Sequence, residues 1–391
     1  MSSTHSCPTP QPVPVLTDGV VTLRGHSMGD VDAIQEQCRD PEMLRWTTVP
    51  RGYTRQDASD FVQHTRDEWA STDAGNRYWA IEAVGGGRPR FVGTIDLRLG
   101  ESASTAFVGY GLHPAARGRG LMTRAVRLAA GHAFDHGLWG TPVRRIHWRA
   151  IVGNWSSRRV AWATGFTAHG TLPETLVNPA NRGGPALDAW HASLATGVEM
   201  VPGAPWFEPA HLQGNGVRLR PFREEDRDAI EERGDPDHWM PGWSVLRRES
   251  FDAWLLRRRT FMAEGQSIEW CVADSATDRA LGTVTVLTRG VPMTGDTAEL
   301  GYQLNPSARG RGVMREAARL AVDFALRPAA EGGLGLRRLV AEAAADNAAS
   351  NRVLESAGFM LFGREHAVDA LPDGSYADAL HWELLPGHRQ A

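Results

Sequence analysis

Hydrophobic and polar positions follow two periods along this chain, one typical of strands and one typical of helices. In residues 300–304 every second position is apolar, as in a half-buried strand. Pro306 then interrupts the strand because proline has no N–H to donate. From Val313 onward, apolar residues recur at the spacing of an amphipathic helix. Residues 300–324 are therefore predicted to form a strand, a glycine-rich turn and a helix in immediate succession.

The same succession occurs twice. Residues 108–134 repeat it, with Arg117 in the place of Arg309 and Gly120 in the place of Gly312. Landmarks on both sides of the turn recur in the same order. The matched segments are 21–24 and 217–220, 92–94 and 281–283, 165–166 and 358–359, and 187–191 and 377–381. A chain that repeats its landmarks in one order is predicted to contain two copies of one domain.

Each copy is predicted to have an α/β fold with the element order β-α-α-β-β-β-α-β-α-β-β. The predicted parts are a mobile proline-rich N-terminus (1–18), a first domain (19–196), a linker (197–215) and a second domain (216–388). In the second domain, the first two helices are expected at residues 224–233 and 248–263. The linker carries Trp206 and Phe207, so it is expected to pack along the first domain.

Composition narrows the classes of protein that the chain can represent. The 391 residues are 42% hydrophobic and 23% charged, with a net charge of −4, which gives no general attraction to nucleic acid. The sequence contains no lysine, so all 42 residues counted as lysine or arginine are arginine. Cys7, Cys38 and Cys271 are too scattered for a disulfide framework or a metal site. With no apolar run of about 20 residues, the sequence predicts a cytoplasmic protein without membrane or nucleic-acid partners.

The Arg-Gly-Arg-Gly turn is the main chemical signal. A turn that opens a helix directs unpaired backbone N–H groups and the positive end of the helix dipole at one small volume, which suits a phosphate. The turn is neither the GxGxxG dinucleotide signature nor a P-loop, which ends in GK[ST]. A glycine-tolerant turn with two solvated arginines is the alternative. Repetition at the same place in both copies favours a pyrophosphate-containing, nucleotide-like ligand.

A second motif, NxxSxRVxxxxGF, follows each turn and begins at Asn347 in the second copy and at Asn154 in the first. Together, the strand, the turn and this motif resemble the GNAT acyl-CoA N-acetyltransferase superfamily, specifically its ribosomal-protein-alanine (Rim-type) branch, in both halves. Met314 and Met122 depart from the family pattern, which usually has glycine or alanine there. Tyr302 and Tyr110 are expected in the core.

The resemblance implies a mixed sheet whose fourth and fifth strands splay apart, with acetyl-CoA as co-substrate in the gap. Backbone amides of the two turns would hold its pyrophosphate, two leucines and two asparagines, Asn347 and Asn154, would contact its pantetheine arm, and Asn351 would also bind the cofactor. These residues are Arg309, Gly310, Arg311, Gly312, Val313, Leu304, Asn347 and Asn351 in the second copy, and Arg117, Gly118, Arg119, Gly120, Leu121, Leu112 and Asn154 in the first. As an alternative role, Asn347 and Asn154 are favoured helix caps.

The reaction requires a base for the amine and an acid for the departing thiolate. Glu299 is the candidate base of the second copy, although a solvent-facing strand residue is an equal interpretation. Phe107 takes its place in the first copy and cannot accept a proton. Ser350 and Ser157 match the family serine proposed as the acid, but serine is also common in the first turn of a helix for local reasons.

The resulting hypothesis is a tandem N-acetyltransferase that transfers acetyl from acetyl-CoA to a primary amine by direct attack in a ternary complex. The second domain is expected to catalyse, and the first to bind cofactor or serve a structural role. The acceptor would be a protein N-terminus or a small amine, and the protein a monomer or homodimer. The alternatives are a non-catalytic acyl-CoA-binding or regulatory protein and a nucleic-acid-binding repeat protein, against which the negative net charge argues.

Overall fold

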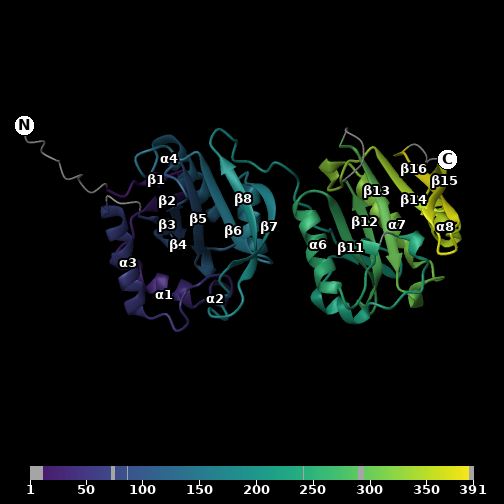
Figure 1. The fold of residues 1–391 in the computed structure, drawn as a ribbon, viewed down its shortest axis with the longest axis horizontal. Coiled ribbons are helices and arrows are strands. Elements are labelled where there is room, and N and C mark those ends of the chain that lie inside the picture. The colour runs from purple at the N-terminus through teal and green to yellow at the C-terminus, as the bar shows by residue number, and fades with distance from the viewer. Residues whose placement is uncertain (1–11, 72–74, 86, 241, 289–294, 387–391) are drawn as a thin grey trace, which may run out of the picture. The chain divides into compact units, whose positions relative to one another are not determined.

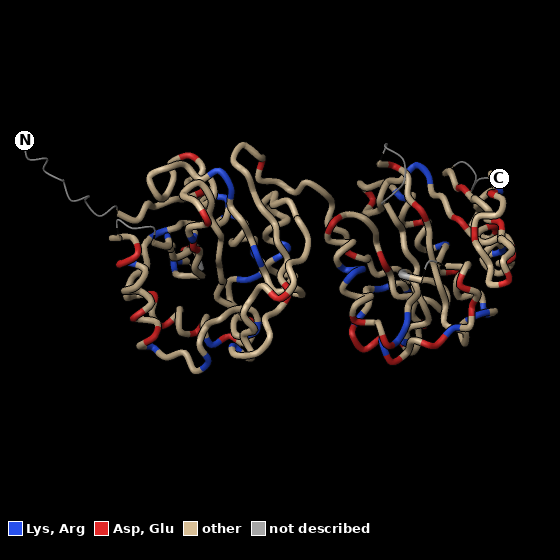
Figure 2. The backbone as a smooth tube through the Cα atoms, in the orientation of Figure 1, with Lys and Arg blue, Asp and Glu red and all other residues tan. Residues whose placement is uncertain are grey.

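The computed structural model describes residues 12–71, 75–85, 87–240, 242–288 and 295–386. The chain divides into two compact units, Met1–Gly203 and Ala204–Ala391, and each contains one eight-stranded sheet with helices on its faces (Figure 1). Acidic and basic residues are interspersed over both units (Figure 2). The predicted α/β fold with one domain in each half is confirmed.

The first unit follows the predicted element order, with a short strand added at its start and a short helix, α2, added between the two helices predicted before the central strands. Its strands are β1 (Leu16–Thr17), β2 (Val21–Arg24), β3 (Arg77–Gly85), β4 (Arg88–Leu99), β5 (Thr105–Leu112), β6 (Arg145–Ile151), β7 (Thr167–Leu176) and β8 (Leu187–Ala195). Its helices are α1 (Val31–Arg39), α2 (Pro41–Trp46), α3 (Arg55–Ala70), α4 (Leu121–His136) and α5 (Trp155–Ala163).

The second unit repeats this order with fewer helices before its central strands. Its strands are β9 (Leu212–Gln213), β10 (Val217–Arg220), β11 (Ser267–Asp274), β12 (Ala280–Leu287), β13 (Thr297–Leu304), β14 (Arg338–Ala344), β15 (Met360–Ala370) and β16 (Tyr376–Leu384). Its α-helices are α6 (Phe251–Ala263), α7 (Val313–Leu326) and α8 (Ala348–Ser356).

One parallel pair of strands interrupts each otherwise antiparallel sheet. The sheet orders are β1-β2-β3-β4-β5-β6-β8-β7 and β15-β16-β14-β13-β12-β11-β10-β9. The parallel pair β13 and β14 is in register only from Thr297 opposite Arg338 to Glu299 opposite Val340. The pair β5 and β6 likewise separates after Val108. The predicted splay is therefore present in both sheets, and it leaves one edge of each strand without a neighbour.

Helices cover both faces of the second sheet, as neighbouring residues of β11 demonstrate. Trp270 belongs to the apolar cluster formed with α7, whereas Cys271 belongs to the cluster formed with Phe251 and Trp254 of α6. Successive strand residues point to opposite faces, so α7 and α6 lie on opposite sides of the sheet. The face covered by α6 also carries Glu299, because Glu299 pairs with Leu287 across β12 and Leu287 with Ser267 on β11.

The α-helix predicted at residues 224–233 is wrong: the structure has a 3₁₀ turn at Glu224–Ala229 followed by extended chain. The predicted segment contains only two adjacent apolar residues, Ala229 and Ile230, and so has no apolar stripe to bury. In the first unit, α1 has such a stripe, with Val31, Ile34 and Cys38 buried.

Both chain segments outside the predicted domains are held by their neighbours. Residues 1–11 lie outside the described part, but β1 pairs with β2, and Trp79 Nε1 donates a hydrogen bond to the carbonyl of Pro14 (3.1 Å). The linker was expected on the first domain, and its start lies there, where Arg127 donates a hydrogen bond to the carbonyl of Met200 (3.0 Å); Phe207, however, packs against the core of the second. The reason is a backbone hydrogen bond from Phe207 to Met262 in α6 (2.9 Å), which fixes this part of the linker.

Within the described residues, no helix has the length and apolar character that crossing a membrane would need.

Candidate functional site

The Arg-Gly-Arg-Gly turn of the second unit exposes a row of backbone donors. Gly310 and Gly312 have φ values of +70° and +76°, which L side chains rarely adopt, so the turn requires glycine at both positions. Helix α7 begins directly afterwards at Val313. Among the described residues, the N–H groups from Gly310 to Arg315 find no hydrogen-bond acceptor. These free donors at a helix N-terminus form an anion-binding surface.

The first arginine of each turn is anchored within its own domain. Arg309 makes two hydrogen bonds of 2.7 Å to the Asp235 carboxylate and a third of 3.2 Å to the carbonyl of Leu304. In the first unit, Arg117 binds Asp40 (2.5 Å) and the carbonyl of Leu112 (3.3 Å). Both arginines therefore brace the turn against the strand before it, and the backbone amides remain the groups directed at a ligand.

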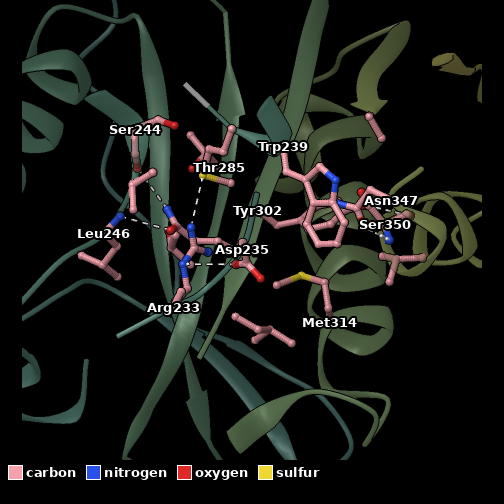
Figure 3. Close-up of a pocket in the computed structure, with 18 of the residues that line it drawn as sticks. Arg233, Asp235, Trp239, Ser244, Leu246, Thr285, Tyr302, Met314, Asn347 and Ser350 are labelled. Carbon is pink, nitrogen blue, oxygen red and sulfur yellow. Dashed lines mark hydrogen bonds and ion pairs between the residues drawn. The ribbon is translucent and has the colours of Figure 1, made fainter. Parts of the chain in front are cut away.

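A cavity of about 1850 Å³ lies beside this turn in the second unit. Figure 3 shows it between the strands, helix α7 and the loop that carries Trp239. It combines the turn, the splayed ends of β13 and β14, and the start of α8. Its lining includes Glu299, Tyr302, Gln303, Leu304, Arg309, Gly310, Gly312, Val313, Met314, Ala341, Glu342, Asn347 and Ser350.

A pair of hydroxyl groups lies on this cavity wall. Tyr302 Oη and Ser350 Oγ are 2.9 Å apart, and Tyr302 also donates to the carbonyl of Ser350 (3.1 Å). Burial raises the pKa of Tyr302 well above its usual value, so its hydroxyl stays protonated. Asn347 caps α8 by accepting a hydrogen bond from the N–H of Ser350 (3.0 Å), which fixes Ser350 beside Tyr302.

Glu299 lies half-buried on the other face of β13. Burial raises the pKa of Glu299, and the nearby charge of Glu342 raises it further. Glu299 makes no hydrogen bond or ion pair within the described residues. A carboxyl group with a raised pKa beside a cavity is suited to accept a proton near neutral pH.

The loop between β10 and α6 forms the remaining wall of the cavity. His238 and Trp239 both bind the carboxylate of Asp346, at 3.0 and 2.9 Å. Gln303 of β13 accepts a hydrogen bond from the N–H of Leu246 (3.1 Å) and donates one to the carbonyl of Ser244 (3.1 Å). The loop is therefore fixed at both ends to elements of the cavity.

The first unit has a different arrangement at the equivalent place. Trp148 of β6 occupies the position of Ala341, and its Nε1 donates to both Tyr110 Oη and Ser157 Oγ at 3.0 Å. The indole is only 3% exposed and lies against the hydroxyls of Tyr110 and Ser157. The equivalent hydroxyl pair of the second unit opens onto the cavity instead. Asn154 caps α5 as Asn347 caps α8, accepting from the N–H of Ser157 (3.1 Å).

Three further contacts are particular to the first unit. A Cβ added to Gly111, which stands where the second unit has Gln303, would come within 2.4 Å of Met43 Cε, so α2 lies directly on β5. Arg182, between β7 and β8, donates a hydrogen bond to the carbonyl of Thr48 and so joins that loop to the chain after α2. Phe107 lies beneath the guanidinium of Arg149, at 4.7 Å.

Most site residues predicted for the second domain surround one cavity. Two do not line it: Arg311 is exposed, and Asn351 binds two backbone carbonyls of its own surroundings and accepts from Trp382 Nε1 (3.0 Å). Of the first-domain set, Arg119 and Gly120 line a smaller cavity of about 520 Å³ beside Asp18. Sequence reasoning missed Tyr302 as a cavity residue, although its repetition with the downstream serine was the available signal.

Comparison with known proteins gives matches in both halves. Residues 21–167 and 217–360 each match the model of the acetyltransferase (GNAT) domain. Over 159 residues, the chain is 30% identical to the probable N-acetyltransferase YjcK of Bacillus subtilis (strain 168), covering 38% of this chain and 82% of that protein.

Solved structures with similarity to the chain include the microcin C7 self-immunity acetyltransferase MccE in complex with acetyl-CoA and AMP. That match has 18% identity and a TM-score of 0.40, and it covers 46% of this chain and 93% of the other. Mycobacterium smegmatis RimJ in complex with CoA-disulfide matches with 22% identity and a TM-score of 0.39, covering 48% of this chain and 88% of the other.

Proposed function

Because this chain belongs to the GNAT acetyltransferase family, with one such domain in each half, we propose that its second domain acetylates a primary amine by direct attack in a ternary complex. The protein is an acyl-CoA-dependent N-acetyltransferase, with acetyl-CoA as co-substrate and an amine as acceptor. The observation that carries the proposal is the convergence of the turn, the splay, Glu299 and the Tyr302–Ser350 pair on one cavity of about 1850 Å³.

The residues present fit acetyl-CoA. The free N–H groups from Gly310 to Arg315 would hold its pyrophosphate, since they point several donors at one place without competing acceptors. Beyond Glu299, β13 has no strand partner on its β14 side, so its backbone can bind the amides of the pantetheine arm. The Nδ2 group of Asn347 has no partner within the described chain and is available to the same arm, and Leu304 lines the gap.

Glu299 and the hydroxyl pair divide the proton transfers between the two faces of β13. Glu299 would accept a proton from the amine, directly or through one water, as the amine attacks the thioester carbonyl. Tyr302 and Ser350 would together supply a proton to the leaving thiolate. Ser350 was the sequence-based candidate for this role, and Tyr302 joins it because the two oxygens are within hydrogen-bond distance.

The assignment of catalysis to the second domain is supported by three differences between the copies. In the first domain, Trp148 fills the place of Ala341, Met43 lies over Gly111, and Phe107 stands in the place of Glu299. A serine whose oxygen already accepts from an indole and lies against a second hydroxyl is poorly placed to serve a leaving thiolate. We therefore assign the first domain a structural role, with Ser157 outside the catalytic set.

Two classes of acceptor fit this scaffold, a protein N-terminus and a small amine. The proposal also includes a cytoplasmic location, which is supported by the buried, unpaired Cys38 and Cys271. We also propose that the protein is a monomer or a homodimer.

A thiol-release assay over pooled amines and N-terminal peptides tests the proposal. Glu299→Gln is expected to lower kcat by roughly a hundredfold or more, and Arg309→Ala to raise KM for acetyl-CoA because the turn loses its brace. Arg117→Ala is the matched control and should leave both values near those of the wild type. If Arg117→Ala were the damaging change, the assignment of the active domain would be wrong.

A further inference from the structure

Two carboxyl groups line one wall of the second domain's cavity. Glu299 belongs to β13 and Glu342 to the neighbouring strand β14. Glu299 is paired with Val340, two positions before Glu342, so Glu299 and Glu342 share one face of the sheet. From the strand spacing and the rise per residue, their Cα atoms are at least roughly 8 Å apart. That distance leaves room for a small molecule to contact both.

No arginine neutralises the charge on this wall. Within the described residues neither Glu299 nor Glu342 pairs with an arginine; the partner of Glu342 is His381, whose Nδ1 lies 3.8 Å from Glu342 and whose Nε2 lies 3.1 Å from Glu365. Several arginines that line the same cavity have carboxylate partners. Arg233 and Arg309 share Asp235, Arg248 binds Asp228, and Arg258 faces Glu269. Repulsion between Glu299 and Glu342 is consistent with the raised pKa of Glu299.

A buried hydroxyl gives an independent indication of a polar ligand. Ser267 Oγ lines the cavity, is 0% exposed and has no hydrogen-bond partner within the described part of the chain. Ser267 lies in the same row across the sheet as Glu299, with Leu287 between them. A buried polar atom without a partner is unfavourable, and a ligand that hydrogen-bonds to it would remove that cost.

We propose that the acceptor is a small amine with at least two positive charges, whose reacting nitrogen lies at Glu299 while Glu342 binds a second ammonium group. This inference rests on the proposed function and specifies its substrate class. The reaction is unchanged: one nitrogen forms the amide bond, the carbon–sulfur bond breaks, Glu299 takes the amine proton and the thiolate is protonated. The second nitrogen stays charged, and its attraction to Glu342 positions the first.

The test compares two amines that differ only in the second ammonium group, 1,4-diaminobutane and butylamine. In the thiol-release assay, wild-type kcat/KM should be roughly tenfold to a hundredfold higher for the diamine, the usual effect of one charge-assisted hydrogen bond. Glu342→Gln should bring the ratio of the two kcat/KM values close to one, mainly through KM for the diamine. Glu355→Gln, an exposed carboxylate on α8 outside the cavity, removes the same charge and should leave the ratio as in the wild type.

Equal kcat/KM values for the two amines, or a ratio that survives Glu342→Gln, would overturn the inference while leaving the acetyltransferase proposal intact. The fall in kcat of roughly a hundredfold or more expected in Glu299→Gln is the separate test of that proposal. If neither amine releases thiol, calorimetry of the CoA-loaded protein decides. The diamine must then bind at least roughly tenfold more tightly than butylamine and lose this advantage in Glu342→Gln; absence of that difference refutes the inference.

Discussion

In the first domain a tryptophan covers the hydroxyl pair that opens onto the cavity in the second. Exchanging the residues at positions 148 and 341 should therefore uncover the pair in the first domain and cover it in the second. In the first domain, the Trp148 indole lies against Tyr110 and Ser157 and donates to both hydroxyls at 3.0 Å. The second domain has Ala341 at that place and the same two hydroxyls, 2.9 Å apart. Ala341→Trp is therefore expected to place its indole against Tyr302 and Ser350, in the space that we propose for the pantetheine arm of acetyl-CoA.

The magnitude follows from what the coenzyme must displace. Each hydrogen bond from the indole contributes about 1 kcal/mol, and burial of the ring contributes about 2–3 kcal/mol. Acetyl-CoA would have to overcome about 4 kcal/mol to reach its place in Ala341→Trp. At 1.4 kcal/mol per factor of ten, its affinity should fall by roughly a thousandfold.

Calorimetric titration with acetyl-CoA measures this directly. Wild-type protein should bind one molecule per chain, and Ala341→Trp should bind none in the same concentration range, with unchanged thermal unfolding as the control for folding. Trp148→Ala should destabilise the first domain by about 3–5 kcal/mol through loss of the buried indole. Trp148→Phe retains an aromatic ring at this place, which should still cover the hydroxyls of Tyr110 and Ser157. Two equal sites in the wild type, or normal affinity and turnover in Ala341→Trp, would refute the reasoning.

Three more predictions concern single residues. Glu299→Gln should stabilise the protein at pH 7. Burial and Glu342 raise the folded pKa of Glu299 above its usual 4.5, so the charged carboxylate destabilises the fold. Urea unfolding should show that the gain in stability disappears as the pH falls below 4.5. Gly312→Ala should cost about 1–2 kcal/mol of unfolding free energy. The cost comes from the φ of +76° alone, because a Cβ would meet no atom. The variant should also weaken acetyl-CoA binding, whereas Gly120→Ala should cost the same stability without the binding defect. Burial lowers the pKa of His26 from 6.5 to about 4, so the unfolded chain takes up the proton at a higher pH than the folded protein does. The free energy of unfolding should therefore fall by about 3 kcal/mol between pH 6.5 and 4. Unfolding curves of wild type and His26→Gln that shift equally with pH would contradict this.

Local signals in the sequence were sufficient for the parts of the site that are continuous in the chain. The turn requires glycine at Gly310 and Gly312, the helix start follows from periodicity, and the repeat identifies both copies. Asn347 and Ser350 were found for the same reason, because the cap and the serine are three residues apart in one helix start.

Contacts between distant segments could not be predicted. Alternation along β13 placed Tyr302 on the face toward α7, but it does not reveal that the splay opens this face to a cavity. The bond between Arg309 and Asp235 joins segments 74 positions apart, and nothing local to either residue indicates it. Trp148 was accessible in principle, since aligning the two copies of the domain places it opposite Ala341.

The Arg309–Asp235 pair joins the turn that we propose to hold the pyrophosphate of acetyl-CoA to the loop between β10 and α6, which lines the cavity. A pyrophosphate bound at the turn brings negative charge close to the same guanidinium, and so competes with Asp235 for it. Acetyl-CoA and the acceptor, which meet only at the thioester and the attacking amine, would thus also be coupled through one positive charge. Saturation with either should change the affinity for the other, and the factor must be the same in both directions.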